Sequence, residues 1–230
     1  MAMSWAELGS YAGAAFAVIW PLLGFSVLIR TLFRKKNLAS SPLAKHAADH
    51  GWRFVAADDG ALRQVGYPDT AFAVPFPGAC NVVRGRYEGR QFLAFEAYSK
   101  AERVAAEEEY EVKRTAVVAI AMPGPLPWLQ VYPENLLTRA LGDITFESDD
   151  FNRRFRVLAQ DTRFAYDVLN PQNMARMLMD PRYAEFPFRF DGEWLWTWQF
   201  EDLGPALIED RLRFLADTLA AVPTFVWSPR

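Results

Sequence analysis

The two histidines of the chain are the residues best suited to chemistry by type and spacing. His46 and His50 are four positions apart, so on a helix both imidazoles lie on one side and can share a metal ion, with Asp49 or Asp58 as a third ligand. No glutamate occupies the position between them that zinc proteases use, and no further His or Cys cluster completes a site. A histidine near a helix C-terminus is also favourable without a metal, through the helix dipole. The sequence therefore predicts no metal and no cofactor, with His46 and His50 as the candidate ligands if one binds.

Other catalytic patterns do not occur in the sequence. It contains neither the G-x-S-x-G turn of hydrolases nor a glycine-rich phosphate-binding motif. Cys80 is the only cysteine, which excludes an internal disulfide and fits a reducing compartment. No base lies near it in sequence, so we expect a packed thiol and not a nucleophile. We predict a protein that is not an enzyme. The alternative is an enzyme whose site is assembled from scattered residues such as Glu96, Asp58 and His50.

Composition and charge narrow the possible partners. The chain has 230 residues, of which 51% are hydrophobic and 15% aromatic, enough to build a packed core. Of its 25 basic and 28 acidic residues, four basic and one acidic lie before Asn37; the remaining 21 basic and 27 acidic residues give that part a net charge of −6. A mildly acidic domain is poorly suited to binding a phosphate backbone, so we expect no nucleic-acid partner.

The N-terminal region carries the pattern of a membrane anchor. Leu8–Ile29 is a run of 22 residues without a charge, and a helix of this length reaches about 33 Å, enough to cross the hydrocarbon core of a bilayer. Pro21 near its middle predicts a kink. We therefore expect a transmembrane anchor over residues 1–33, a basic linker over 34–41 and a soluble domain over 42–230.

The charges around the anchor predict its direction. No basic residue precedes the apolar run, as a cleaved signal peptide would require, whereas four follow it: Arg30, Arg34, Lys35 and Lys36. The positive-inside rule then places the N-terminus outside and the C-terminal domain in the cytoplasm. We predict a single-pass protein of the cell membrane.

Three features suggest contacts at the membrane, each with a simpler interpretation. The basic cluster Arg34, Lys35 and Lys36 could bind anionic lipid, although its simplest role is to set the topology. Three hairpin arginines could also meet lipid or an acidic partner, although a charged hairpin edge needs no ligand: Arg84, Arg86 and Arg90. Gly13 and Ala17 form a small-xxx-small pair that could bring two anchors together as a homodimer, although such pairs are common in membrane helices.

The strand pattern of the soluble part is dominated by hairpins. Asn81–Tyr87 and Arg90–Ser99 flank the turn Glu88-Gly89. Val112–Met122 is a further strand, and prolines at positions 123, 125 and 127 are expected to end it before another short strand at Trp128–Tyr132. Phe186–Phe190 and Trp194–Phe200 are predicted to form a second hairpin across Asp191-Gly192.

Helices are expected at both ends of this part. One follows Pro42 and ends at Gly51, and another carries an apolar stripe from Ile208 to Val222 at spacings of three and four. Strands joined by hairpins favour an α+β domain, a mainly antiparallel sheet with helices packed on one face. The alternative is a small pleckstrin-homology-like barrel with a C-terminal helix.

Three tryptophans alternate along the last predicted strand, so they share one face of the sheet: Trp194, Trp196 and Trp198. If exposed, they would form an aromatic platform for a partner or for lipid headgroups. A buried role is favoured, because a sheet face needs side chains to pack against a covering layer.

The second half of the chain carries a recognisable motif. It consists of Glu147-Ser-Asp-Asp-Phe151-Asn-Arg-Arg-Phe155-Arg-Val157, then Asp161, Leu169-Asn-Pro171 and Met174. With this motif the chain resembles, best over residues 142–200, a bacterial family defined by domain of unknown function 3137, whose members pair an N-terminal hydrophobic span with such a domain. Asn170 departs from it, since the family often has threonine there. The resemblance implies membrane anchorage and brings no catalytic residues. From the residues themselves we expect Phe151, Phe155 and Val157 in a core, with Asp161 and Pro171 starting helices.

These features together predict a membrane-tethered protein whose cytoplasmic domain is a protein- or peptide-interaction module. Tethering raises the effective concentration of such a module at the membrane. The alternatives are a domain that senses anionic lipid and the enzyme without a sequence motif described above.

Overall fold

The computed structural model describes residues 41–66, 78–100, 112–134 and 143–228. The chain divides into two compact units, Met1–Lys45 and His46–Arg230, and the fold given below is that of the second. The predicted anchor Leu8–Ile29 and the basic residues of the linker lie outside the described residues. Within the described part, no helix is both long and apolar enough to span a membrane.

Six strands form one sheet in which every pair of neighbours is antiparallel. The strands are β1 (Arg53–Ala57), β2 (Gly78–Tyr87), β3 (Arg90–Lys100), β4 (Val112–Pro133), β5 (Phe155–Ala159) and β6 (Phe188–Gln199). The order runs from β1 to β5, and β6 also pairs with β4. The expected α+β class, a mainly antiparallel sheet with helices packed on it, is confirmed. The sheet is open, since among the described strands β1 pairs only with β2 and β5 only with β4, so the barrel alternative is wrong.

Strand β4 organises the sheet. Its 22 residues pair with β3 through Val112–Ile120, with β5 through Leu129–Pro133, and with β6 along both halves. The predicted break at the prolines is wrong: they lie in the middle of β4, where its register with β6 shifts between Ala121 and Leu129. A bulge removes ladder hydrogen bonds locally, and a residue without an N–H is tolerated there.

One of the two predicted hairpins forms. Glu88 (φ 48°) and Gly89 (φ 79°) make a two-residue turn between β2 and β3, with Tyr87 opposite Arg90, as expected for a type I′ hairpin. The second hairpin prediction is wrong, because β6 runs without reversal through Asp191-Gly192. Gly192 has φ 56° and lies opposite Leu126, so its positive φ serves the bulge against β4 instead of a turn.

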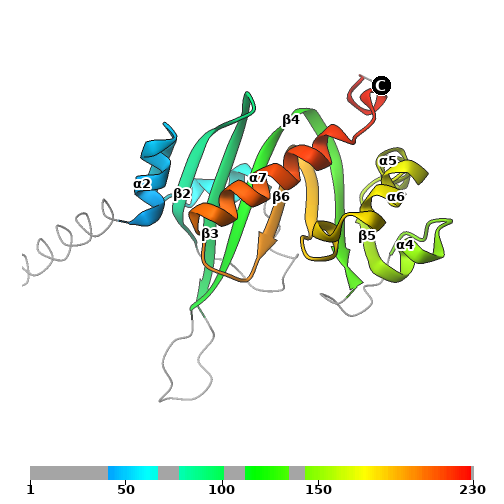
Figure 1. Ribbon diagram of the computed structural model, residues 1–230, viewed down its shortest axis with the longest axis horizontal. Coiled ribbons are helices and arrows are strands. Elements are labelled where there is room, and N and C mark those ends of the chain that lie inside the picture. The colour runs from blue at the N-terminus through cyan, green and yellow to red at the C-terminus, as the bar shows by residue number, and fades with distance from the viewer. Residues whose placement is uncertain (1–40, 67–77, 101–111, 135–142, 229–230) are drawn as a thin grey trace, which may run out of the picture. The chain divides into compact units, whose positions relative to one another are not determined.

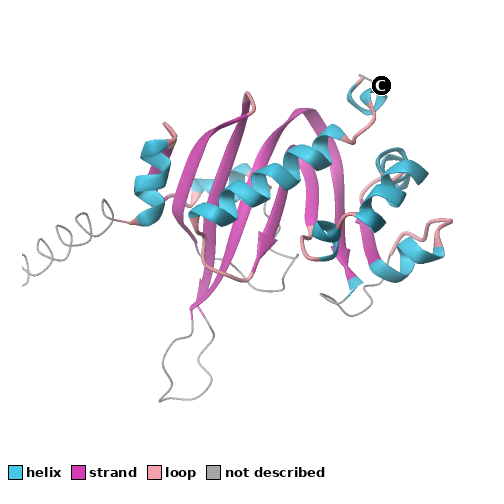
Figure 2. Ribbon diagram, in the orientation of Figure 1, coloured by secondary structure: helices cyan, strands magenta, loops and turns pink. Residues whose placement is uncertain are grey.

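The sheet is covered on both faces. Helix α7 (Pro205–Ala220) lies along one face (Figures 1 and 2). There the ring centroids of Phe214 and Phe188 are 6.0 Å apart, and the Arg211 guanidinium donates a hydrogen bond to the side-chain oxygen of Gln199. The register of β6 against β4 shifts around Gly192, which changes the phase of the alternation after Phe188 and Phe190. Gln199 faces α7, so its neighbour Trp198, with Trp196 and Trp194, faces the other way, where the short helix α3 (Gly60–Gln64) packs. The predicted placement of helices on one face is therefore too simple.

The tryptophan face forms the main apolar cluster. Trp194, Trp196 and Trp198 are 7%, 0% and 5% exposed and pack with residues of α3, β2, β3 and β4, among them Val65 and Phe95. The three tryptophans are thus core side chains and not an exposed platform. Small residues make room for them, since Ala119 and Ala121 of β4 are the cross-strand partners of Trp196 and Trp194.

Several short helices and turns lie near β5 at one end of the sheet (Figure 1). They are α4 (Asp149–Arg154), α5 (Thr162–Val168), α6 (Pro171–Met179), and the 3₁₀ turns η2 (Pro181–Ala184) and η3 (Thr224–Trp227). Asp161 caps α5 by accepting from the N–H groups of Arg163 and Phe164, and Pro171 is the first residue of α6. Phe151, Phe155 and Val157 are buried. The structural interpretation of this segment is confirmed.

Candidate functional site

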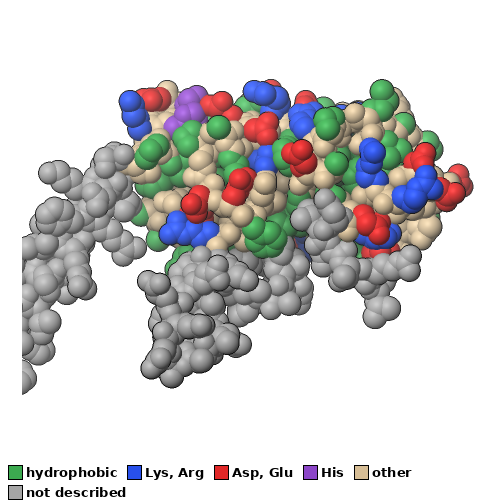
Figure 3. Space-filling model, turned by 60° about the horizontal axis from the view of Figure 1, so that its bottom comes forward, with side chains coloured by type: hydrophobic (Ala, Val, Ile, Leu, Met, Phe, Trp, Pro, Cys, Tyr) green, Lys and Arg blue, Asp and Glu red, His purple; other side chains and the backbone are tan. Residues whose placement is uncertain are grey.

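The two histidines meet a carboxylate from α7. Both lie at the C-terminal end of α2 (Pro42–Asp49) and its following turn, and Glu209 projects toward them from the first half of α7. Glu209 Oε1 is 3.2 Å from His46 Nε2 and 3.7 Å from His50 Nε2. One potential ligand atom from each residue lies within 4.8 Å of those of the other two. The histidines reach the surface beside charged side chains (Figure 3), so the group is accessible to solvent.

Neighbouring residues hold the two imidazoles in place. The turn that begins after Asp49 and carries Gly51 at φ 67° brings Trp52 back over the helix end. Trp52 stacks on the His50 ring at 4.7 Å and meets the His46 ring edge-on at 5.5 Å. The space for Trp52 comes from Gly85 of β2, where a Cβ atom would lie 2.3 Å from the indole. The Trp52 indole therefore restricts the side-chain rotamers of both histidines by packing against their rings.

The histidine pair could be predicted from the sequence, but the third member of the group could not. Asp58 is elsewhere, in an ion pair with Arg84 at 2.9 Å, and Asp49 is not part of the group. Glu209 was missed because it lies in a distant helix, and a single sequence carries no signal that brings it to α2. The structure therefore brings the two histidines together, whereas the carboxylate that joins them is neither Asp49 nor Asp58.

The hairpin arginines serve the local structure. Arg84 pairs with Asp58, and Arg86 donates to the Gly89 carbonyl at 3.1 Å. Arg84 and Arg86 also line a hollow of about 300 Å³ together with Gln64 and Trp194. Arg90 is exposed at the start of β3. Arg84 and Arg86 thus have different partners, and Arg90 is not among the residues that line this hollow.

Glu96 is a buried carboxylate with a full set of donors. Its side chain is 2% exposed and accepts from the Leu203 N–H at 2.8 Å, the Asn81 amide at 3.0 Å and Arg114 at 3.2 Å. The Cys80 thiol lies 3.6 Å away as a fourth donor. Glu96 therefore fixes the segment before α7 to β3. The residues suggested for a scattered active site have separate partners: Glu96 has these donors, Asp58 has Arg84, and His50 has Glu209.

The environment of Cys80 predicts an unreactive thiol. Burial and the neighbouring carboxylate of Glu96 raise the pKa of Cys80 from its ordinary value of 9.0 to about 11. At neutral pH the fraction of Cys80 present as thiolate is about 100-fold lower than for an ordinary cysteine. A more basic thiolate is about tenfold more nucleophilic, so the net reaction rate is about tenfold lower. We expect the native protein to react with a disulfide reagent at least about tenfold more slowly than the urea-denatured chain, with the rate rising as the pH increases toward 11. Because Cys80 is the only cysteine, the thiol product that the reagent releases reports on this residue alone. Equal reaction rates in the native and the denatured protein would contradict the expectation.

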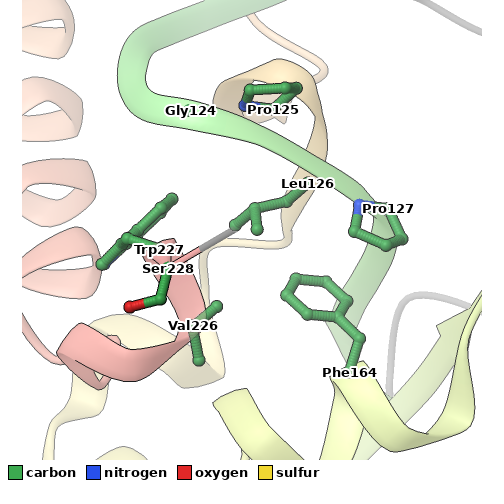
Figure 4. Close-up of a pocket in the computed structure, with 8 residues that line it drawn as sticks. All are labelled: Gly124, Pro125, Leu126, Pro127, Phe164, Val226, Trp227 and Ser228. Carbon is green, nitrogen blue, oxygen red and sulfur yellow. The ribbon is translucent and has the colours of Figure 1, made fainter. Parts of the chain in front are cut away.

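A second concave feature is apolar. The bulged part of β4, α5 and η3 enclose a pocket of about 400 Å³ lined by Gly124, Pro125, Leu126, Pro127, Phe164, Val226, Trp227 and Ser228. Figure 4 shows Leu126 and Phe164 facing the turn that carries Val226 and Trp227. Among the described lining residues, Ser228 supplies the one hydroxyl group. Phe225, next to this lining, is 59% exposed.

The geometry thus defines an open antiparallel α+β domain with a histidine–carboxylate group on one helix pair and an apolar pocket at the other end of α7. No family model and no curated protein matches the sequence. Among solved structures, the chain is similar to the mycobacterial trehalose monomycolate transport factor A, TtfA, with 17% sequence identity and a TM-score of 0.56. The match covers 82% of this chain and 97% of that one. At this identity the likeness concerns the fold.

Proposed function

We propose that this chain is a single-pass membrane protein whose domain binds an apolar segment of a protein partner in the pocket between β4 and η3. In this proposal Leu8–Ile29 anchors the chain, and the basic residues that follow hold the domain on the cytoplasmic side. The observation that carries the proposal is the apolar pocket itself. Its volume lies within the range of ligand-binding pockets, and its walls offer anchoring surface rather than groups for acid–base chemistry.

The pocket has properties that suit recognition of a side chain. Pro125 and Pro127 fix the backbone of one wall, so little conformational entropy is lost when a partner binds. Trp227 and Phe164 provide aromatic surface, the kind that contributes most at interfaces. The neighbouring Phe225 extends this surface outward, since more than half of its side chain is exposed.

We further propose an accessory role in transport. The structure that this chain resembles carries the name of a transport factor. A tethered domain without chemistry of its own can act on such an assembly by keeping a partner at high effective concentration near the membrane. The proposed partner is therefore a membrane protein that offers an apolar segment at the cytoplasmic face.

Photo-crosslinking in native membranes tests this proposal. A photoreactive residue in place of Phe225 is expected to give an adduct with one discrete membrane protein, whereas the same residue at Arg153, which is 72% exposed on α4, is not. Leu126→Glu places a carboxylate in the pocket and is expected to reduce the adduct at least about tenfold, because an unpaired charge is costly to bury. Met179→Glu, at a side chain that is 85% exposed on α6, is the matched control. Equal adducts at both positions, or an adduct that survives Leu126→Glu, would reject the pocket as the docking site.

A further inference from the structure

We propose that His46, His50 and Glu209 form a binding site for a divalent transition-metal ion, with Zn²⁺ as the ion that fits best. This proposal is independent of the docking pocket and concerns a different part of the domain. The ligand types are those of known zinc sites, in which two imidazoles and a carboxylate leave a further coordination position open. Imidazole nitrogen also selects zinc and its neighbours in the first transition series over magnesium and calcium.

The distances between the ligand atoms match a tetrahedral ion. With bonds of about 2.0–2.1 Å, two ligand atoms of a tetrahedral zinc ion lie about 3.3 Å apart. Glu209 Oε1 lies 3.2 Å from His46 Nε2 and 3.7 Å from His50 Nε2. These two distances lie within about 0.4 Å of that value, and the ligand atoms of the two histidines lie within 4.8 Å of each other.

The hydrogen bonds leave the required lone pairs available. His50 Nδ1 lies 2.9 Å from the His46 carbonyl oxygen, which can only accept, so this nitrogen carries the proton and Nε2 presents its lone pair. Such a bond from the second ring nitrogen is the usual way in which proteins orient a metal-bound histidine. His46 Nε2 is buried and makes no hydrogen bond within the described part of the chain. A metal ion would bond both to this nitrogen and to Glu209 Oε1, which lies 3.2 Å from it.

A simple ion pair explains the arrangement less well. The side chains of His50 and Glu209 are 43% and 45% exposed, and ion pairs at such exposure contribute little. If both imidazoles were protonated to pair with Glu209, two positive rings would lie with their centroids 4.2 Å apart. A metal ion uses both neutral rings and the carboxylate at once, without this repulsion.

The position that holds the general base in zinc proteases is occupied here by an alanine. In zinc proteases the residue after the first histidine is a glutamate that acts as general base, whereas here it is Ala47, which is fully buried. A metal ion at this place would tie residues 46–50 to α7. The exposed side of Glu209 and His50 leaves room for water or a partner's side chain at the fourth position.

Zinc binding by the full-length protein in detergent tests the proposal. The protein, stripped with a chelator, is expected to take up one Zn²⁺ per chain in competition with a chromogenic chelator, and its thermal midpoint should rise with zinc concentration. His50→Ala and Glu209→Gln should each weaken binding at least about tenfold, whereas Glu193→Gln, at an exposed residue of β6, should leave it unchanged. Circular dichroism of each variant without zinc confirms that it is folded.

Cobalt provides a second measurement at the same site. Co²⁺ in place of zinc should show the intense visible absorption of a four-coordinate ion in the wild type and in Glu193→Gln, and lose it in His50→Ala. Two results would overturn the proposal: a wild type that binds no zinc in the competition, or zinc affinity that is the same in folded His50→Ala and Glu209→Gln as in the wild type. Neither result bears on crosslinking at Phe225, so the two proposals fail separately.

Discussion

Glu96→Ala is expected to lower the free energy of unfolding by about 3–5 kcal/mol, because it leaves a buried backbone N–H and part-buried side-chain donors without their acceptor. The carboxylate is almost fully buried and accepts from Leu203 N–H, Asn81 and Arg114. Hydrogen bonds to a charged group contribute about 1.5–3 kcal/mol each, and a buried N–H left unpaired costs about 1–3 kcal/mol. Arg114 is 48% exposed and can turn to water, which limits its share of the loss.

A graded series separates these contributions. Glu96→Gln keeps the volume and one acceptor for Leu203, so we expect a smaller loss of about 1–2 kcal/mol. Glu193→Ala removes an exposed carboxylate of the same sheet and should change stability by no more than about 0.5 kcal/mol. Urea unfolding of the full-length protein in detergent, followed by tryptophan fluorescence, measures all three. If Glu96→Ala unfolds at the same urea concentration as Glu193→Ala, the network around Glu96 does not fix the segment before α7.

Features that depend on neighbouring residues were predictable from the sequence. The Glu88-Gly89 hairpin, the cap at Asp161 and the helix start at Pro171 are each determined within a few residues, and the structure has all three. The alternation of Trp194, Trp196 and Trp198 likewise indicated one shared face, and burial of that face followed from their size.

Features that depend on a distant strand were not predictable. Asp191-Gly192 has the composition of a hairpin turn, yet β6 continues through it because β4 is long enough to pair with both halves. The positive φ of Gly192 is used at a bulge, and the same residue type would serve a turn equally well. Local turn chemistry therefore could not distinguish a reversal from a bulge without knowledge of the partner strand.

The candidate metal site was likewise predictable only in part. The spacing of His46 and His50 along one helix could be read from the sequence, whereas Glu209 enters only through the packing of α7 against that helix end. The apolar pocket joins three separate segments, β4, α5 and η3, and had no local signal at all. The N-terminal anchor rests on the sequence pattern and stays a prediction.

Trp196→Ala is expected to lower the free energy of unfolding by about 3–5 kcal/mol, the range found when a large aromatic side chain is removed from a core. Trp196 is completely buried, lies 5.0 Å from the ring of Trp198, and packs in the cluster that joins α3 to β3 and β4. Its cross-strand partner is Ala119, which is too small to fill the space that the indole would leave. The cavity therefore stays largely open, and the loss is expected near the upper end of this range.

Two further substitutions show whether this loss reflects packing at the centre of the sheet. Trp196→Phe keeps an aromatic ring and should cost about 1–2 kcal/mol, since a smaller void remains. Met179→Ala removes a side chain that is 85% exposed and should stay within about 0.5 kcal/mol of the wild type. Far-ultraviolet circular dichroism in urea measures the three proteins without relying on the removed fluorophore. A loss for Trp196→Ala no larger than that for Met179→Ala would mean that the tryptophan face does not hold the sheet to α3, and that stability comes from the face covered by α7.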